Sequence, residues 1–158
     1  MALIHRRTLD IYASHRQFYF WDPDSPFAAP EDYTAEDSAR RLKAGDHLVA
    51  VLPERFESVP VEIEIHDAEP QIEAKDWDHV VECSLHVAGR SITVEECCGS
   101  TLAKFTVEPG WYRLRSFHGA LGTVKDDQNG NDHYLVVLWP APADTLRVIR
   151  QWTQENTA

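Results

Sequence analysis

The sequence predicts a mainly β protein, an antiparallel β-sandwich of about eight or nine strands with one short inserted helix. Three observations support this prediction. Apolar residues recur at every second position through most of the chain, turns containing Pro or Gly separate these runs, and one segment alone carries helix-start signals. Because the 158 residues show neither a linker nor an internal repeat, we expect one domain over residues 1–158.

The first predicted strand is long, since Leu9, Ile11, Tyr19 and Trp21 all fall on one face of an extended chain. The turn cluster DPDSP at residues 22–26 ends it, because proline offers no backbone donor to a sheet. A connecting loop is expected after this cluster.

One helix is predicted from Ala35 to Lys43. Thr34 and Asp37 have the spacing of a capping box, the residues that follow are good helix formers, and Gly45 supplies a stop signal.

Eight further runs predict the remaining strands. In the clearest of them Val61, Ile63 and Ile65 alternate with Glu62 and Glu64, which indicates one buried face and one solvated face. The eight runs cover residues 47–52, 59–66, 81–87, 91–95, 102–107, 111–117, 133–139 and 146–152.

The charge of the chain excludes several partners. Fifteen Lys and Arg stand against 26 Asp and Glu, a net charge of −11, which repels phosphate backbones and anionic membranes. We therefore expect no direct nucleic-acid or membrane partner. The three cysteines, an odd number, suit unpaired thiols in a reducing compartment, and no stretch is apolar enough for a signal peptide or a membrane span. Together these features predict a cytoplasmic protein.

No motif in the sequence names a catalytic, metal or cofactor site. CxxC, HExxH, GxSxG and GxGxxG patterns are all missing, and Ser14 and His15 point to opposite faces if they lie in a strand. The loop KDDQNGND at residues 125–132 offers oxygen ligands for calcium, but Lys125 stands where the first carboxylate is needed. A solvated hairpin tip is favoured there. We predict no metal, no cofactor and no nameable catalytic residue, and a non-enzymatic role is favoured over an enzyme.

Acidic residues concentrate between Glu54 and Glu82, where ten carboxylates meet two basic residues for a net of −8. Two carboxylates on one strand face, about 6.6 Å apart, repel each other, so such a face is either strongly solvated or used to attract a basic protein. The residues predicted to bind that partner are Glu62, Glu64, His66, Asp67, Glu69, Asp76 and Asp78.

Four segments of the chain resemble an uncharacterised family of bacterial β-rich proteins. They read LDIYASHRQFYFWD from Leu9, IHDAEPQIEAKDWDHVVECSL from Ile65, VEPGWYRLRSFHGAL from Val107 and NDHYLVVLWPAP from Asn131. The SHRQF segment from Ser14 and the EPGWYRL segment within the third region are also similar to the competence DNA-entry nuclease inhibitors. This more distant resemblance implies a β-rich protein that inhibits a nuclease by binding it.

These observations predict a non-enzymatic protein-binding module, an inhibitor or immunity-type partner of a basic protein such as a nuclease or a toxin. The alternative is a small-ligand-binding or hydrolytic β-sandwich with a pocket at one end of the sheets, near residues 22–33 and 121–132. The sequence indicates no particular oligomeric state.

Overall fold

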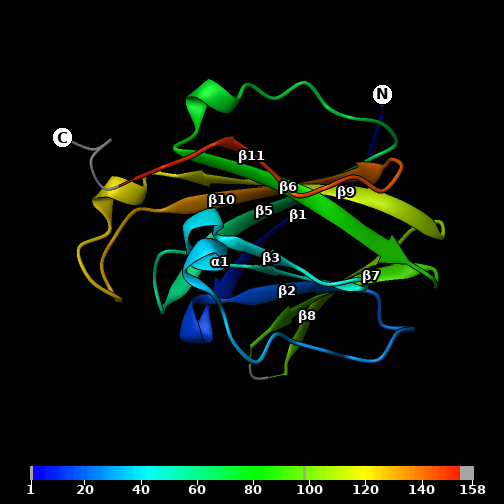
Figure 1. The fold of residues 1–158 in the computed structure, drawn as a ribbon, viewed down its shortest axis with the longest axis horizontal. Coiled ribbons are helices and arrows are strands. Elements are labelled where there is room, and N and C mark those ends of the chain that lie inside the picture. The colour runs from blue at the N-terminus through cyan, green and yellow to red at the C-terminus, as the bar shows by residue number, and fades with distance from the viewer. Residues whose placement is uncertain (1, 98, 154–158) are drawn as a thin grey trace.

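A computed structural model describes residues 2–97 and 99–153. In this part of the chain eleven strands form two sheets that stack on each other (Figure 1). The strands are β1 (Leu3–Tyr12), β2 (Phe18–Trp21), β3 (Leu42–Ala44), β4 (Leu48–Val51), β5 (Ser58–His66), β6 (His79–Val87), β7 (Ser91–Glu96), β8 (Thr101–Thr106), β9 (Gly110–Gly119), β10 (His133–Pro140) and β11 (Arg147–Arg150). The helical elements are α1 (Ala35–Arg40) and three short 3-10 turns, η1 (Ser14–Arg16), η2 (Ala74–Asp76) and η3 (Leu121–Thr123).

The six-stranded sheet has the order β1-β5-β10-β9-β6-β11, and the five-stranded sheet has the order β3-β4-β2-β7-β8. Every pairing in the described strands is antiparallel except that of β5 with β10, where Val61 lies opposite Tyr134 in a parallel register. The predicted class, a mainly antiparallel β-sandwich with one short helix, is confirmed, with more strands than the eight or nine expected.

The main core lies between the two sheets and follows the alternation in the sequence. Val61 and Ile63 of β5 and Leu85 of β6 are fully buried there, opposite Phe18 and Phe20 of β2. Burying a side chain of this size contributes about 1.5–3 kcal/mol relative to leaving it in water.

The long first strand expected from Leu9 to Trp21 was wrong, because β1 already begins at Leu3 and the chain changes sheet within the predicted run. β1 ends at Tyr12 at the edge of the six-stranded sheet, and β2 begins at Phe18 inside the five-stranded sheet. Between them His15 and Arg16 both have φ of 57°, a left-handed conformation that breaks the extended chain. In the sequence the odd-numbered apolar pattern runs on across this break, so it could not show the change of sheet. In the structure Leu9 and Ile11 face the main core, whereas Tyr19 and Trp21 belong to a separate cluster on the other face of β2.

The capping box that predicts α1 is confirmed. Thr34 Oγ1 accepts a hydrogen bond from the Asp37 amide at 3.0 Å, and Asp37 Oδ2 accepts one from the Thr34 amide at 2.9 Å. The helix ends at Arg40, three residues earlier than predicted, because Arg41 adopts φ of 59° and its amide bonds back to the Asp37 carbonyl. No described helix is long and apolar enough to cross a membrane.

Candidate functional site

A segment between β5 and β6 crosses the outer face of the six-stranded sheet (Figure 1). Its apolar residues Ile72, Ala74 and Trp77 pack on a second buried cluster of that sheet, which includes Phe117 and Val137. We call residues 67–78 the acidic strap. Because its apolar side chains face the sheet, its carboxylates are left to face outward.

Four of the seven predicted partner-binding residues belong to this strap. Asp67, Glu69 and Asp76 are exposed, whereas Asp78 is half-buried and accepts a hydrogen bond from the Leu121 amide at 2.8 Å. Glu73, which was not in the predicted set, is exposed beside them. The exposed carboxylates of the strap are therefore Asp67, Glu69, Glu73 and Asp76.

The other three predicted residues lie on β5. Alternation predicted that all three side chains face solvent, but two of them are buried. Glu64 and His66 are each only 7% exposed, and only Glu62 is substantially accessible. Glu64 accepts hydrogen bonds from Arg6 Nη2 at 3.0 Å and from His66 Nε2 at 2.8 Å. Burial raises the pKa of the Glu64 carboxyl, but the bonds from His66 and Arg6 outweigh it and hold that pKa below its ordinary value.

A buried ion cluster on the same sheet was missed by the sequence analysis. Glu82 of β6 accepts hydrogen bonds from Arg113 Nε and Arg115 Nε, each at 2.9 Å, and Arg147 Nη2 lies 3.4 Å from its carboxylate. Burial raises the pKa of the Glu82 carboxyl, but the hydrogen bonds from Arg115 and Arg113 lower it by more. The net pKa lies below the ordinary value, so the group stays ionised. Arg115 Nη2 also reaches Glu69 of the strap at 2.8 Å.

This cluster changes the electrostatic interpretation of the acidic segment. The net of −8 counts only bases that are close in the sequence, whereas Arg6, Arg113 and Arg115 come from β1 and β9 and neutralise Glu64, Glu82 and part of the charge on Glu69. In the part of the chain that the structure describes, Glu73 and Asp76 form no ion pair. The negative charge that remains unpaired on this face, and that can attract a basic protein, is therefore concentrated on the strap.

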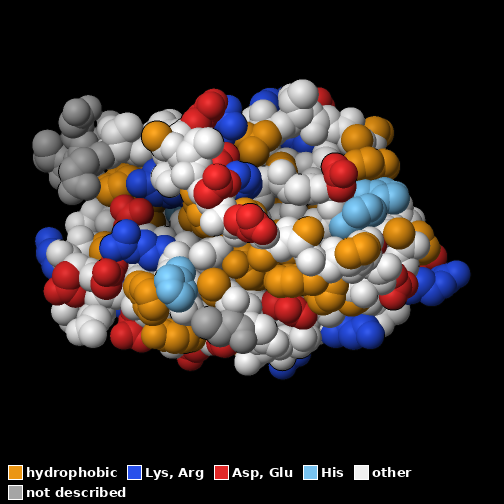
Figure 2. Space-filling model, turned by 60° about the horizontal axis from the view of Figure 1, so that its bottom comes forward, with side chains coloured by type: hydrophobic (Ala, Val, Ile, Leu, Met, Phe, Trp, Pro, Cys, Tyr) orange, Lys and Arg blue, Asp and Glu red, His pale blue; other side chains and the backbone are white. Residues whose placement is uncertain are grey.

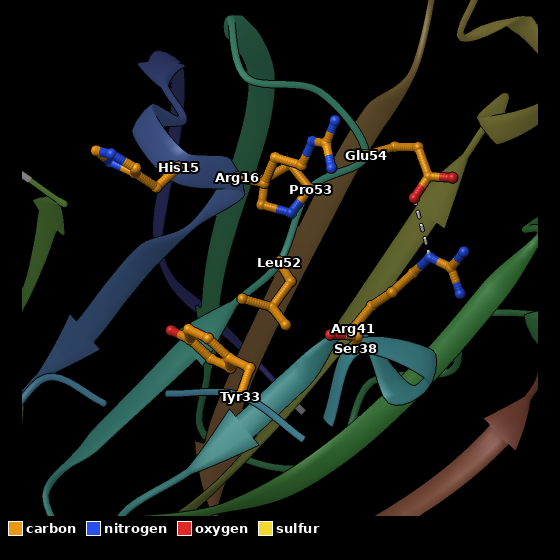
Figure 3. A pocket seen from close by; sticks show the side chains of 8 residues that line it. All are labelled: His15, Arg16, Tyr33, Ser38, Arg41, Leu52, Pro53 and Glu54. Carbon is orange, nitrogen blue, oxygen red and sulfur yellow. Dashed lines mark hydrogen bonds and ion pairs between the residues drawn. The ribbon is translucent and has the colours of Figure 1, made fainter. Parts of the chain in front are cut away.

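A cavity of about 270 Å³ opens where α1, η1 and the chain after β4 meet (Figure 3). Arg41 and Glu54 point toward each other across one side of it, with Arg41 Nε 3.4 Å from Glu54 Oε1. Its lining residues are His15, Arg16, Tyr33, Ser38, Arg41, Leu52, Pro53 and Glu54.

Left-handed backbone is concentrated at this cavity. Among residues 2–97 and 99–153 four non-glycine residues have positive φ, and three of them, His15, Arg16 and Arg41, line the cavity. Such conformations are costly for residues with a Cβ and persist where the surrounding structure holds them, often at functional sites. The alternative function predicts a pocket near residues 22–33 and 121–132. Of these two loops, the first contributes Tyr33 to the cavity lining and the second contributes no lining residue.

Buried polar groups continue from the cavity into the core. The Tyr134 hydroxyl accepts a hydrogen bond from the Glu54 amide at 2.9 Å and donates one to Asp132, which also accepts from Arg55 Nε at 2.6 Å. Burial, with the Asp132 carboxylate beside it, raises the pKa of Tyr134 well above its ordinary value. The hydroxyl thus stays neutral and joins the chain after β4 to the loop that precedes β10.

His79 and His118 form a second polar pair at this end of the core, with ring centroids 5.2 Å apart. His79 Nε2 donates to the Arg40 carbonyl at 2.7 Å, and its Nδ1 accepts from the Trp152 amide at 3.2 Å. The pKa of His79 is lowered to about 4, mainly by burial. The hydrogen bond to the Arg40 carbonyl raises the pKa by a smaller amount, and the positive charge of Arg41 lowers it. His79 is therefore a neutral structural group at pH 7.

The carboxylates of the loop at residues 125–132 turn to separate partners. Asp126 accepts hydrogen bonds from two amides of its own loop, Asp127 pairs with Arg16, and Asp132 lies in the core with Arg55. Within the described residues no group of three or more His, Cys, Asp or Glu side chains could hold a metal ion.

Ser14 and His15 do not point apart as a strand would require. They lie in η1, and Ser14 Oγ is 3.1 Å from His15 Nδ1, while Cys97 Sγ is 3.8 Å from the same nitrogen. A hydroxyl or thiol beside an imidazole is one part of a nucleophilic site. The described hydrogen bonds of His15 include none to a carboxylate that would orient the ring as in a triad.

The sequence matches no protein-family model and no curated protein. The fold, in contrast, is shared with solved β-sandwich proteins over nearly the whole chain. One is ComJ from Bacillus subtilis, an inhibitor of the DNA-degrading activity of NucA, with a TM-score of 0.65 and 18% identity over 89% of this chain and 98% of ComJ. Another is the protein of crocagin biosynthetic gene J, with a TM-score of 0.60 and 21% identity over 90% of this chain and all of that one. The predicted resemblance to competence nuclease inhibitors is confirmed at the level of the fold.

Proposed function

We propose that this protein is a binding module that inhibits a DNA-degrading nuclease by forming a complex with it. The observation that carries the proposal is the structural match to ComJ, which spans both chains almost completely. Because one fold can serve many functions, the charge of the acidic strap is the second support for this proposal.

The exposed carboxylates of the acidic strap support a basic partner. Glu69, Glu73 and Asp76 project from a segment whose apolar side chains pack on the six-stranded sheet. This packing fixes the positions of their charges relative to the sheet. A nuclease that binds DNA needs a basic surface for the phosphates, and an acidic protein of net charge −11 is attracted to such a surface over a distance set by the salt concentration.

The test uses the nuclease from the same genome that is most similar to NucA. We expect DNA cleavage to stop when the protein is added at an equimolar amount, and the two proteins to co-elute in gel filtration. Binding should weaken steeply as salt rises, because long-range attraction is screened. Full cleavage in the presence of a tenfold excess, without co-elution, would rule out the proposal.

Charge reversal tests the surface separately. The variant Glu69→Lys/Glu73→Lys/Asp76→Lys should fold, since all three side chains are exposed, and should bind the nuclease at least tenfold more weakly. The matched control is Asp10→Lys/Glu31→Lys/Asp46→Lys, which makes the same change of charge at exposed positions outside the strap. Equal weakening in both variants would mean that net charge, and not the strap, determines binding.

The cavity beside α1 favours a second candidate function, the binding of a small ligand. Its support is the concentration of left-handed backbone conformations at His15, Arg16 and Arg41 around one pocket. In a screen of small molecules by thermal shift, Ser38→Trp should abolish a true ligand's effect by filling the cavity mouth, whereas Ala39→Trp on the same helix should not. A ligand that stabilises both variants equally binds elsewhere.

A further inference from the structure

An apolar groove of about 400 Å³ lies at the far end of the sandwich from the cavity described above. The two ends are joined by β10, whose first residues reach Glu54 through Tyr134 and whose last residue, Pro140, lines the groove. Ile4 and Tyr112 form further parts of its apolar wall.

The groove lies where the two sheets meet at this end of the sandwich. Ile4 comes from β1 and Thr106 from β8, and the other lining residues come from β5, β9 and β10 or from the connections beside these strands. β1 is an edge of the six-stranded sheet and β8 is an edge of the five-stranded sheet. His5 joins these edges, because its Nε2 lies 2.8 Å from the Thr106 carbonyl and its ring lies 5.5 Å from that of Phe105. The groove is therefore held open by the fold itself, which reduces the cost of ordering it when something binds.

Apolar side chains line this concave surface, and one of them is open to solvent. Ile4 is 54% exposed, beside the largely buried Ile65, Val107 and Tyr112. Apolar groups that cluster around a concave surface and have a polar rim are typical of interaction sites, whereas isolated exposed residues are not.

The rim of the groove carries acidic groups from two directions. Asp67 is the first residue of the acidic strap, and Glu108 comes from the turn between β8 and β9. Glu108 forms an ion pair with Arg90 at 3.6 Å. Both side chains are more than three-quarters exposed, so this pair is weak and easily exchanged. The groove is thus apolar inside, acidic at its rim and continuous with the strap.

We propose that the groove receives an aliphatic side chain of a protein partner, in a segment where Lys or Arg residues flank that side chain and face Asp67 and Glu108. The proposal rests on the proposed function and specifies where its basic partner is anchored. An apolar residue buried in a preformed pocket and surrounded by complementary charges is the usual form of a binding hot spot. The strap would then attract the partner, and the groove would hold it.

The first experiment uses the same nuclease as probe. The variants Ile4→Ser and Glu108→Lys should each weaken its binding by at least tenfold. The matched controls are Ile149→Ser, which changes an isoleucine of similar exposure on the opposite edge strand of the same sheet, and Asp46→Lys. If the wild type binds the nuclease and the groove variants bind it as well as the controls do, the groove proposal is overturned while the proposed function stands.

A second experiment tests the groove without the nuclease. The capped peptide N-acetyl-Lys-Leu-Lys-amide is titrated into the full chain, and amide chemical shifts are followed. We expect saturable shifts at Ile4, Thr106 and Val107 that disappear in Ile4→Ser, and at least fivefold weaker binding of N-acetyl-Glu-Leu-Glu-amide. Shifts scattered over the surface, or equal binding of the acidic peptide, would overturn the proposal even if the nuclease also fails to bind.

Discussion

Glu82 of β6 and Arg113 of β9 form an ion pair that is almost completely removed from water. Arg113 Nη2 is 2.8 Å from Glu82 Oε2, and the two side chains are 4% and 3% exposed. Arg113 Nη1 and Nη2 also donate to the carbonyls of Asp144 and Thr145, at 2.9 Å and 3.0 Å. One guanidinium therefore fastens both a neighbouring strand and the chain that leads into β11.

Glu82→Gln should destabilise the fold by about 3–5 kcal/mol, because Arg113 and Arg115 would keep their buried charges without a carboxylate between them. Urea denaturation measures the change. Glu69→Gln is the control, since Glu69 pairs with Arg115 at the surface and its loss should cost less than about 1 kcal/mol. Equal costs for the two variants would contradict the structural role given to Glu82.

Acidification should weaken the fold before most carboxylates titrate, because His79 has a pKa of about 4 when folded and about 6.5 when unfolded. Between these two values the unfolded chain holds a proton that the folded chain does not, so the free energy of unfolding falls as the pH falls. Titration of His79 by itself should lower the free energy of unfolding by about 3 kcal/mol between pH 6.5 and pH 4. Above pH 6.5 it should cause no change with pH.

The measurement is denaturant unfolding at several pH values. His79→Asn should lower stability at pH 7 and reduce the slope between pH 6.5 and pH 4. Glu64 and Glu82, whose pKa values are lowered, should add their own loss only below their ordinary value of 4.5. A stability that is flat down to pH 4.5 would contradict the burial of a neutral His79.

Glu62→Lys and Glu64→Lys should differ strongly, although alternation alone treats the two positions alike. Glu64 is buried against His66 and Arg6, so a lysine there places a second positive charge beside Arg6 and should cost several kcal/mol. Glu62 is accessible, and its reversal should cost about 0.5 kcal/mol. Thermal unfolding of both variants distinguishes these outcomes, and similar melting temperatures would refute the burial of Glu64.

The thiols should differ in reactivity. Cys83 is buried in the main core, and burial raises its pKa to about 12, whereas Cys97 is partly exposed. In a Cys98→Ser background an aromatic disulfide reagent should label one thiol in the native protein and two in denaturant. Rapid labelling of both thiols under native conditions would show that the core around Cys83 opens easily.

The fold was predictable from the sequence because its strongest signal is local. Alternation at Val61 and Ile63 and the capping box at Thr34 each depend on residues a few positions apart, and both were confirmed. The break at His15 and Arg16 was not predicted because the apolar pattern of the sequence continues through it, although Tyr19 in the structure faces away from the core that holds Ile11.

The site was less predictable because its charges are paired over long sequence distances. Arg6 lies opposite Glu64, and Arg115 lies opposite Glu82, only once the registers of β1 with β5 and of β6 with β9 are known. The alternating pattern assigns Glu64 to a polar face, but it does not show that Arg6 of a different strand covers that side chain. Glu73, in the loop between strands, gave no pattern that set it apart from its acidic neighbours.

The parallel pairing of β5 with β10 also bears on how fast the chain can fold. It brings residue 61 beside residue 134, more than seventy positions later, and joins the β1-β5 pair to the block formed by β10, β9 and β6. Closing so large a loop costs chain entropy before any contact repays it, and non-local pairing of this kind is associated with folding in milliseconds to seconds. Each antiparallel block can form from nearer neighbours, so the meeting of β5 and β10 is the step at which the two blocks become one sheet.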